Sequence, residues 1–148
     1  MDRDDEKILR VTNKELFYSA MLLGFGRLVG VEYFFPTEEK ALSAELEEAK
    51  RTLHKKRLLK ENSKGEISLD PDLTKCIGLC SNPERCTVVD SGGIYAIIYE
   101  INGENMILER TGEEENAVRF FEDRDSATGY ARNMLENAAK EGAKNVHS

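Results

Sequence analysis

The chain has few of the residues from which catalytic centres are usually built. It contains only two histidines among its 148 residues. His54 lies within a run of lysines and arginines, which favours its neutral form and differs from a base held by a carboxylate. His147 lies one residue from the end of the sequence, where an ordered site is rare. Because no Ser–His–Asp or Cys–His pairing follows from these positions, the sequence predicts that the protein is not an enzyme.

Cysteines are also scarce, and their spacing differs from that of known metal sites. The three cysteines, Cys76, Cys80 and Cys86, are separated by three and five residues. Structural zinc sites usually contain closer Cys-x-x-Cys pairs, and a fourth ligand would have to be a histidine or a carboxylate. Cys76 and Cys80 can share one face of a helical turn, which keeps a metal site open. We interpret all of them as reduced thiols, small enough to fill a core, and expect no bound metal.

Long apolar runs and nucleotide-binding motifs are missing as well. The longest apolar stretch, residues 20–31, contains Arg27 and three glycines and falls short of the roughly 18 residues that a membrane span needs. Gly24-Phe25-Gly26 has neither the third glycine nor the preceding strand of a dinucleotide-binding turn. Residues 1–7 are acidic and differ from a secretory signal. The sequence thus predicts no membrane insertion, no cofactor and a cytoplasmic location.

Charge, in contrast, is abundant, and acidic residues are in excess. The formal net charge is −7, with 33% charged and 40% hydrophobic residues. This balance is typical of a globular protein. It disfavours general affinity for nucleic acid or anionic membranes, because both attract basic surfaces.

Helical periodicity dominates the first half of the chain. Thr12 and Glu15 have the spacing of a capping box, and apolar residues recur at helical intervals from Leu16 to Leu23. A second helix opens near Thr37 with an apolar stripe and a basic C-terminal end. After a turn and a short alternating strand, Asp70–Pro71 starts a third helix. The second helix, the turn and the strand together have a winged-helix-like outline.

The second half of the chain changes to the alternation that is typical of strands. The apolar pattern predicts four strands, at 86–89, 94–101, 106–109 and 117–121. Asn102–Gly103 is typical of a type I′ hairpin turn, which favours an antiparallel meander. A helix from about Ser126 has an apolar face that can pack on this sheet, and Gly142 is its expected terminator. The predicted fold class is therefore α+β.

These elements divide the chain into a lead-in, one domain and a tail. The predicted bounds are a flexible acidic lead-in at 1–11, a single α+β domain at 12–142 and a loose tail at 143–148. Within the domain, a seam near Ser81–Glu84 separates a helical half, 12–82, from a sheet-plus-helix half, 83–142. We expect one domain because neither half is convincing as an independent one.

A basic cluster at the end of the second helix is the candidate nucleic-acid site. Its members are Lys50, Arg51, Lys55, Lys56 and Arg57. In a winged helix, the helix before the wing enters the major groove and basic side chains hold phosphates. Neighbouring glutamates and the acidic net charge oppose such binding, because the phosphate contacts must overcome that field. A winged-helix DNA-binding transcriptional regulator is therefore the alternative hypothesis.

The strand at 94–101 is apolar on both faces and supplies a candidate protein-binding site. The face opposite Ile94, Ala96 and Ile98 consists of Tyr95, Ile97, Tyr99 and Ile101. A strand that is apolar on both faces normally lies between two layers. The C-terminal helix can cover one face, and the other face meets either the N-terminal helices or a partner. We favour an intramolecular core, with a partner or a homo-oligomer as the open alternatives.

The order of these elements resembles a known family. The capped helix, the run Leu53–Leu59, the turn, the run Ile67–Leu73, the meander and the closing helix are similar to EspG-like proteins and their shorter EsaE-like relatives. The similarity covers residues 12–138 and carries over no functional residue. Those proteins are cytosolic chaperones that deliver substrates to the type VII secretion machine. The resemblance implies a non-catalytic chaperone or adaptor without a cofactor, whose partner is a helical secreted protein.

Overall fold

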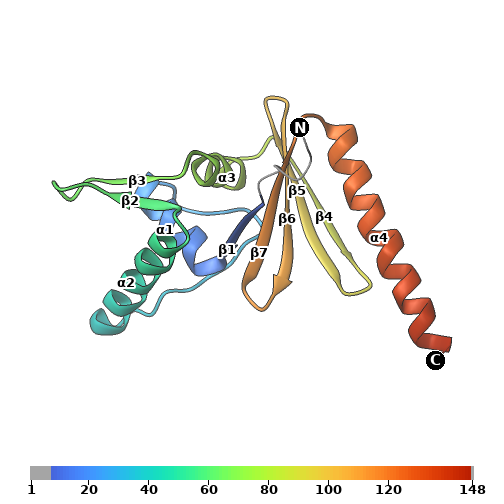
Figure 1. Ribbon diagram of the computed structural model, residues 1–148, viewed down its shortest axis with the longest axis horizontal. Helices are drawn as coiled ribbons and strands as arrows, with labels where there is room; N and C mark the ends of the chain where they lie inside the picture. The colour runs from blue at the N-terminus through green and yellow to red at the C-terminus, as the bar shows by residue number, and fades with distance from the viewer. Residues whose placement is uncertain (1–7, 148) are drawn as a thin grey trace. The chain divides into compact units, whose positions relative to one another are not determined.

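The computed structural model describes residues 8–147, with side chains described up to residue 140, and its fold is α+β as predicted (Figure 1). The chain divides into two compact units. One, here called the helical unit, is Val11–Asn82, and the other, the sheet unit, combines the residues up to Arg10 with those from Pro83 onward. The division after Asn82 lies within the seam that the sequence places at Ser81–Glu84.

The helical unit, all of which is described, contains three helices and a two-stranded hairpin. These are α1 (Asn13–Leu23), α2 (Glu39–Lys55), β2 (Leu59–Glu61), β3 (Ile67–Leu69) and α3 (Pro71–Ser81). Helix α1 packs against both α2 and α3. The buried side chains of this unit include Leu16, Ala49, Leu53, Leu73 and Ile77.

Side-chain caps set where α2 and α3 begin. The Asp70 carboxylate accepts the backbone N–H of Asp72 at 2.8 Å, directly before Pro71, so the predicted start of α3 is confirmed. Helix α2 is capped by Glu38 instead of the expected Thr37. A carboxylate at this position satisfies backbone N–H groups and interacts favourably with the positive end of the helix dipole.

Helices α1 and α2 end in the same left-handed motif, although only α1 has a glycine there. Gly24 after α1 has a φ of +85°, and Arg57 after α2 has a φ of +65°. The N–H of Leu58 donates to the carbonyl of Leu53 at 2.9 Å, as in a Schellman motif, and α1 ends with the equivalent bond. An L side chain in this conformation costs about 1–2 kcal/mol. Arg57 is therefore strained where Gly24 is not.

Replacing Arg57 by glycine should stabilise the protein. We expect Arg57→Gly to raise the free energy of unfolding by about 0.5–1 kcal/mol, because the relieved strain exceeds the added chain entropy of glycine. Urea denaturation followed by circular dichroism measures this change. The matched control is Gly24→Ala, which should lower the free energy of unfolding by about 1 kcal/mol. An Arg57→Gly variant that is less stable than the wild type would show that the strain is outweighed by contacts of the arginine.

The sheet unit is built on a sheet that, within the described residues, has five strands in the order β1-β7-β6-β5-β4. The strands are β1 (Leu9–Thr12), β4 (Arg85–Ser91), β5 (Ile94–Ile101), β6 (Glu104–Gly112) and β7 (Glu115–Phe121). Strands β4 to β7 form an antiparallel meander, and β1 crosses the boundary between the units. Helix α4 (Arg124–His147) packs on β5, β6 and β7.

Turn chemistry sets the register of the central hairpin. Asn102 and Gly103 have φ values of +50° and +82°, so both adopt the left-handed conformation that a type I′ turn requires. The resulting register places Ile97 opposite Leu108 across β5 and β6. The buried centre of the core between the sheet and α4 is formed by Ala96, Ile107, Ala127 and Ala131. Partly buried side chains pack around it: Val89, Ile98, Phe121, Tyr130 and Met134.

The described sheet has one strand more than the four that the sequence predicted. Strand β1 occupies residues 9–12, where a flexible lead-in over 1–11 was expected; residues 1–7 of that prediction lie outside the described residues. Leu9 and Val11 are buried and Arg10 between them is exposed, which is the alternation of a half-buried strand. The pattern was too short to stand out beside the acidic residues that precede it.

The last helix extends beyond Gly142, where the sequence predicted its end and a loose tail at 143–148. Helix α4 continues through Gly142 to His147. One glycine within a helix costs only about 1 kcal/mol, which good helix-forming neighbours offset. Although α4 has 24 residues, no helix within residues 8–147 combines the length and apolar character needed to cross a membrane.

Candidate protein-binding site

Strand β5 carries the residues that the sequence indicated as a partner surface. Ile97 and Tyr99 are completely buried, whereas Tyr95 and Ile101 are half-buried. The Arg110 guanidinium lies over the Tyr95 ring, 4.4 Å from its centroid. Side chains that are completely buried cannot contact a partner in this conformation. These residues therefore do not form an open binding surface.

The basic cluster at the end of α2 is largely paired with carboxylates of the same unit. Lys50 Nζ lies 3.1 Å from Glu61 Oε1, and this hydrogen bond is the main cause of a raised pKa of Lys50. Lys56 Nζ lies 2.6 Å from Glu15 Oε1. A phosphate would have to compete with these carboxylates, so the cluster offers fewer cations to DNA than its sequence indicates.

The elements before the β2–β3 hairpin also differ from those of a winged helix. The helix-turn-helix of such domains has a turn of about 3–4 residues. Helices α1 and α2 are instead joined by residues 24–38. Lys55 and Arg57 are exposed, whereas Lys50 and Lys56 are paired, so only part of the predicted basic cluster is available to a phosphate.

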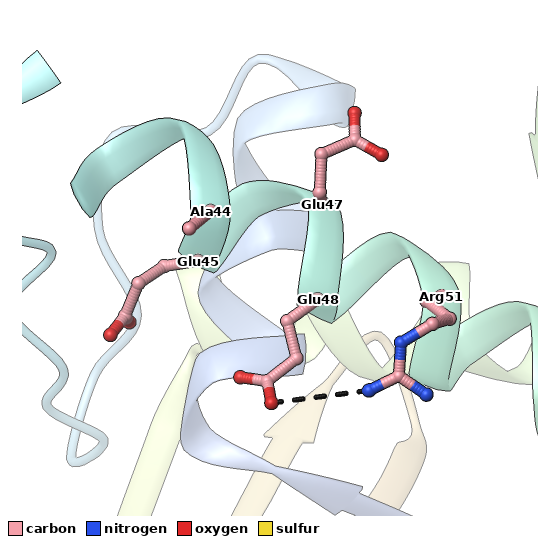
Figure 2. A pocket seen from close by; sticks show the side chains of 5 residues that line it. All are labelled: Ala44, Glu45, Glu47, Glu48 and Arg51. Atoms are coloured by element: carbon pink, nitrogen blue, oxygen red, sulfur yellow. Dashed lines mark ion pairs between the residues drawn. The ribbon is translucent and has the colours of Figure 1, made fainter. Parts of the chain in front are cut away.

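A shallow hollow on α2 is lined by acidic side chains (Figure 2). Its lining consists of Ala44, Glu45, Glu47, Glu48 and Arg51. Arg51 Nη2 lies 4.0 Å from Glu48 Oε2, and Glu48 also pairs with Lys14. The hydrogen bond from Lys14 is the main cause of a lowered pKa of Glu48. A general base needs a pKa near neutral, so Glu48 is shifted away from catalytic use.

Cys76 and Cys80 lie buried on α3. Their mutual hydrogen bond, followed by burial, raises the pKa of the Cys76 thiol and disfavours its thiolate, which is the form that binds metals. Cys86 lies exposed on β4 of the sheet unit. In residues 8–147, no three His, Cys, Asp or Glu side chains are grouped as metal ligands would be. Cys76 and Cys80 occupy the positions of small core side chains.

Exposed apolar residues gather instead at the end of α1. Met21, Leu22 and Leu23 are 52%, 42% and 38% exposed, and Phe25 is 40% exposed. Successive helical residues point about 100° apart, so the last turn of α1 is open to solvent around more than half of its circumference. All residues of Met21–Arg27 are exposed, and we call this stretch the apolar segment.

Buried residues fix the apolar segment at both ends. Ala20 before it and Leu28 after it are buried. The N–H of Phe25 donates to the Ala20 carbonyl at 2.9 Å and closes the end of α1. The N–H of Val29 donates to the carbonyl of Cys80, near the end of α3, at 2.7 Å. The apolar segment is therefore tied to the helical unit at both ends.

A buried carboxylate ties the start of α1 to α2. Glu15 is 1% exposed. Its Oε1 accepts the N–H of Thr12 at 2.9 Å and lies 2.6 Å from Lys56 Nζ, and its Oε2 accepts the Thr52 hydroxyl at 2.5 Å. A buried anion needs such donors because it has lost its hydration. The predicted capping box of Thr12 and Glu15 is confirmed, and the same carboxylate also fixes the direction of α1.

One feature of the sequence indicates the apolar segment, although helical periodicity suggested that its residues are buried. The segment lies within residues 20–31, the longest apolar stretch of the chain. Helical spacing predicted Met21 and Leu23 to continue the buried face that begins at Leu16. The added Leu22 makes the last turn apolar all round, which one core-facing stripe does not require.

Replacing Glu15 by glutamine tests the network at the start of α1. We expect Glu15→Gln to lower the free energy of unfolding by about 2–3 kcal/mol. Lys56 loses its counter-charge, and the NH₂ group of the glutamine replaces a carboxylate oxygen that accepts hydrogen bonds, so that donors face each other. Urea denaturation provides the measurement. Glu48→Gln, which removes an exposed charge from α2, is the control and should change stability little. Equal effects of the two substitutions would contradict the role of the buried carboxylate.

Comparison with known proteins identifies no relative: no protein-family model matches the chain, and no curated protein matches its sequence.

Proposed function

We propose that the chain is a non-catalytic protein-binding chaperone or adaptor that contacts its partner through the apolar segment. The observation that carries this proposal is the exposure of large apolar side chains on one continuous segment: Met21, Leu22, Leu23 and Phe25. Complete burial of one such side chain contributes about 1.5–3 kcal/mol, and burial of the exposed part contributes a share of this. Contiguous exposed apolar residues are typical of interaction sites.

The shape and charge of the apolar segment favour a protein partner with an apolar groove. An exposed apolar helix end fits into a groove such as the one between two packed helices. Within residues 20–31, Arg27 is the only charged residue, whereas the whole chain has a net charge of −7. That net charge repels an anionic bilayer, which otherwise also binds exposed apolar side chains.

The resemblance to EspG-like proteins gives this proposal a more specific form. In that form the chain is a cytoplasmic chaperone for type VII secretion substrates, and the partner is a helical hairpin. The apolar segment would lie in the groove between the two helices of the substrate and cover its apolar surface until export. The order of the elements supports this form.

Affinity capture with matched variants tests the proposal. The tagged wild type and a Leu22→Glu/Phe25→Glu variant are used to capture proteins from the host, and the captured protein is then purified for calorimetry. We expect a helical partner in near-equal amount with the wild type. Its affinity for the variant should fall about 100-fold, because two buried apolar contacts are replaced by charges without partners.

Two controls make this experiment decisive. A Lys55→Glu/Arg57→Glu variant, altered only in the basic cluster, should bind the partner as the wild type does. Circular dichroism establishes that both variants are folded. Undiminished binding by Leu22→Glu/Phe25→Glu would contradict the proposed surface. Co-sedimentation of the wild type, but not of this variant, with anionic vesicles would identify a membrane as the ligand instead.

A winged-helix regulator is the second candidate, favoured by the β2–β3 hairpin that directly follows α2. Its test is fluorescence anisotropy of labelled duplex DNA over a range of salt concentrations. Because Lys50 and Lys56 are paired with carboxylates, we expect no binding near physiological salt. Wild-type binding that weakens with salt and is lost in Lys55→Glu/Arg57→Glu would favour the regulator over the protein-binding proposal.

A further inference from the structure

Strand β4 forms an open edge of the sheet. Within the described residues it pairs only with β5, because it is the last strand in the order β1-β7-β6-β5-β4. All of its residues except Val89 are exposed, and Val88 is 54% exposed. Helix α4 packs mainly on β5, β6 and β7, and Val89 of β4 packs against the same core. The backbone groups of β4 that face away from β5 therefore lie at an edge of the described sheet, where another strand can pair.

This edge lacks the features that usually protect a sheet from pairing with another chain. Natural edge strands are short, or carry lysine, proline, a bulge or an inward-pointing charge. Strand β4 has seven residues, Arg85–Ser91, with neither lysine nor proline. Its register with β5 is unbroken over all seven. The opposite edge strand, β1, has only four residues and is protected by its short length.

We propose that β4 pairs antiparallel with β4 of a second copy of the chain, centred on Val88. A two-fold axis perpendicular to the sheet requires one residue to lie opposite its own copy. Centring on Val88 uses all seven residues of the strand. It also places exposed Val88 opposite Val88 of the second copy and makes Thr87–Val89 pairs on the other face. Such β-branched cross-strand pairs stabilise antiparallel sheets.

The charges of β4 favour the register centred on Val88 over the register whose axis lies one residue earlier. Arg85 and Asp90 are the charged residues of β4. With the axis at Val88, Arg85 lies opposite Ser91 and Asp90 lies opposite Cys86, so no like charges meet. An axis one residue earlier would place Glu84 opposite Asp90, and like charges directly opposite one another destabilise a pair.

The proposed pairing joins two sheets into one continuous sheet. An axis perpendicular to the sheet keeps both copies of α4 on the same face. The apolar segment belongs to the helical unit and takes no part in this pairing, so dimerisation and partner binding are separable by mutation.

Sedimentation equilibrium over a range of protein concentrations tests the pairing. We expect the wild type to form a reversible dimer and Val88→Lys to remain monomeric, because two lysines would face each other at the axis. The matched control is Thr111→Lys, which adds the same charge at an exposed position of β6 and should dimerise as the wild type does. Circular dichroism establishes that each variant is folded.

Cysteine cross-linking tests the register. In a Cys86→Ser background, Val88→Cys places two Cα atoms about 4.5–5.5 Å apart, within the range of a disulfide. Thr87→Cys places them about 8 Å apart, outside that range. Mild oxidation should therefore yield a covalent dimer from Val88→Cys and little from Thr87→Cys. A wild type that stays monomeric, or faster cross-linking of Thr87→Cys, would overturn the proposal.

Discussion

The buried carboxylate of Glu15 is the constraint on which the helical unit depends. Its donors come from the start of α1 and from α2, namely the Thr12 N–H, the Thr52 hydroxyl and the Lys56 ammonium group. A carboxylate without these donors could not remain buried. The direction of α1 follows from this requirement, and the Schellman motif at Gly24 then ends the helix within the apolar segment. The hydrogen bonds to Glu15 inside the helical unit thus set the direction of the helix that ends in the exposed apolar segment.

Much of the fold could be predicted from local sequence signals. The capping box at Thr12, the cap at Asp70 and the turn at Asn102–Gly103 each depend on residues a few positions apart. Strand β1 escaped prediction because it has only four residues, too few for alternation to be distinctive. The end of α4 was not predicted correctly, because the cost of a glycine within a helix and the helix propensity of its neighbours differ by little free energy.

The functional surfaces were harder to predict because they depend on contacts between distant residues. The basic cluster around Lys56 was visible in the sequence, but its neutralisation by Glu15 and Glu61 joins positions that only the fold brings together. Periodicity identifies an apolar face but not what covers it. Tyr99 of β5 is buried, in line with the intramolecular core that we favoured for this strand. Met21 and Leu23 are exposed, although helical spacing predicted that they continue a buried face.

Hydrogen–deuterium exchange of the chain, alone and with its captured partner, tests the central claim most directly. If the apolar segment is the partner-binding surface, the amides of residues 21–28 will exchange more slowly in the complex. Those of the basic end of α2 and of β5 will exchange at unchanged rates. Slower exchange at β5 or at residues 50–57, with no change at residues 21–28, would contradict the assignment of partner binding to the end of α1.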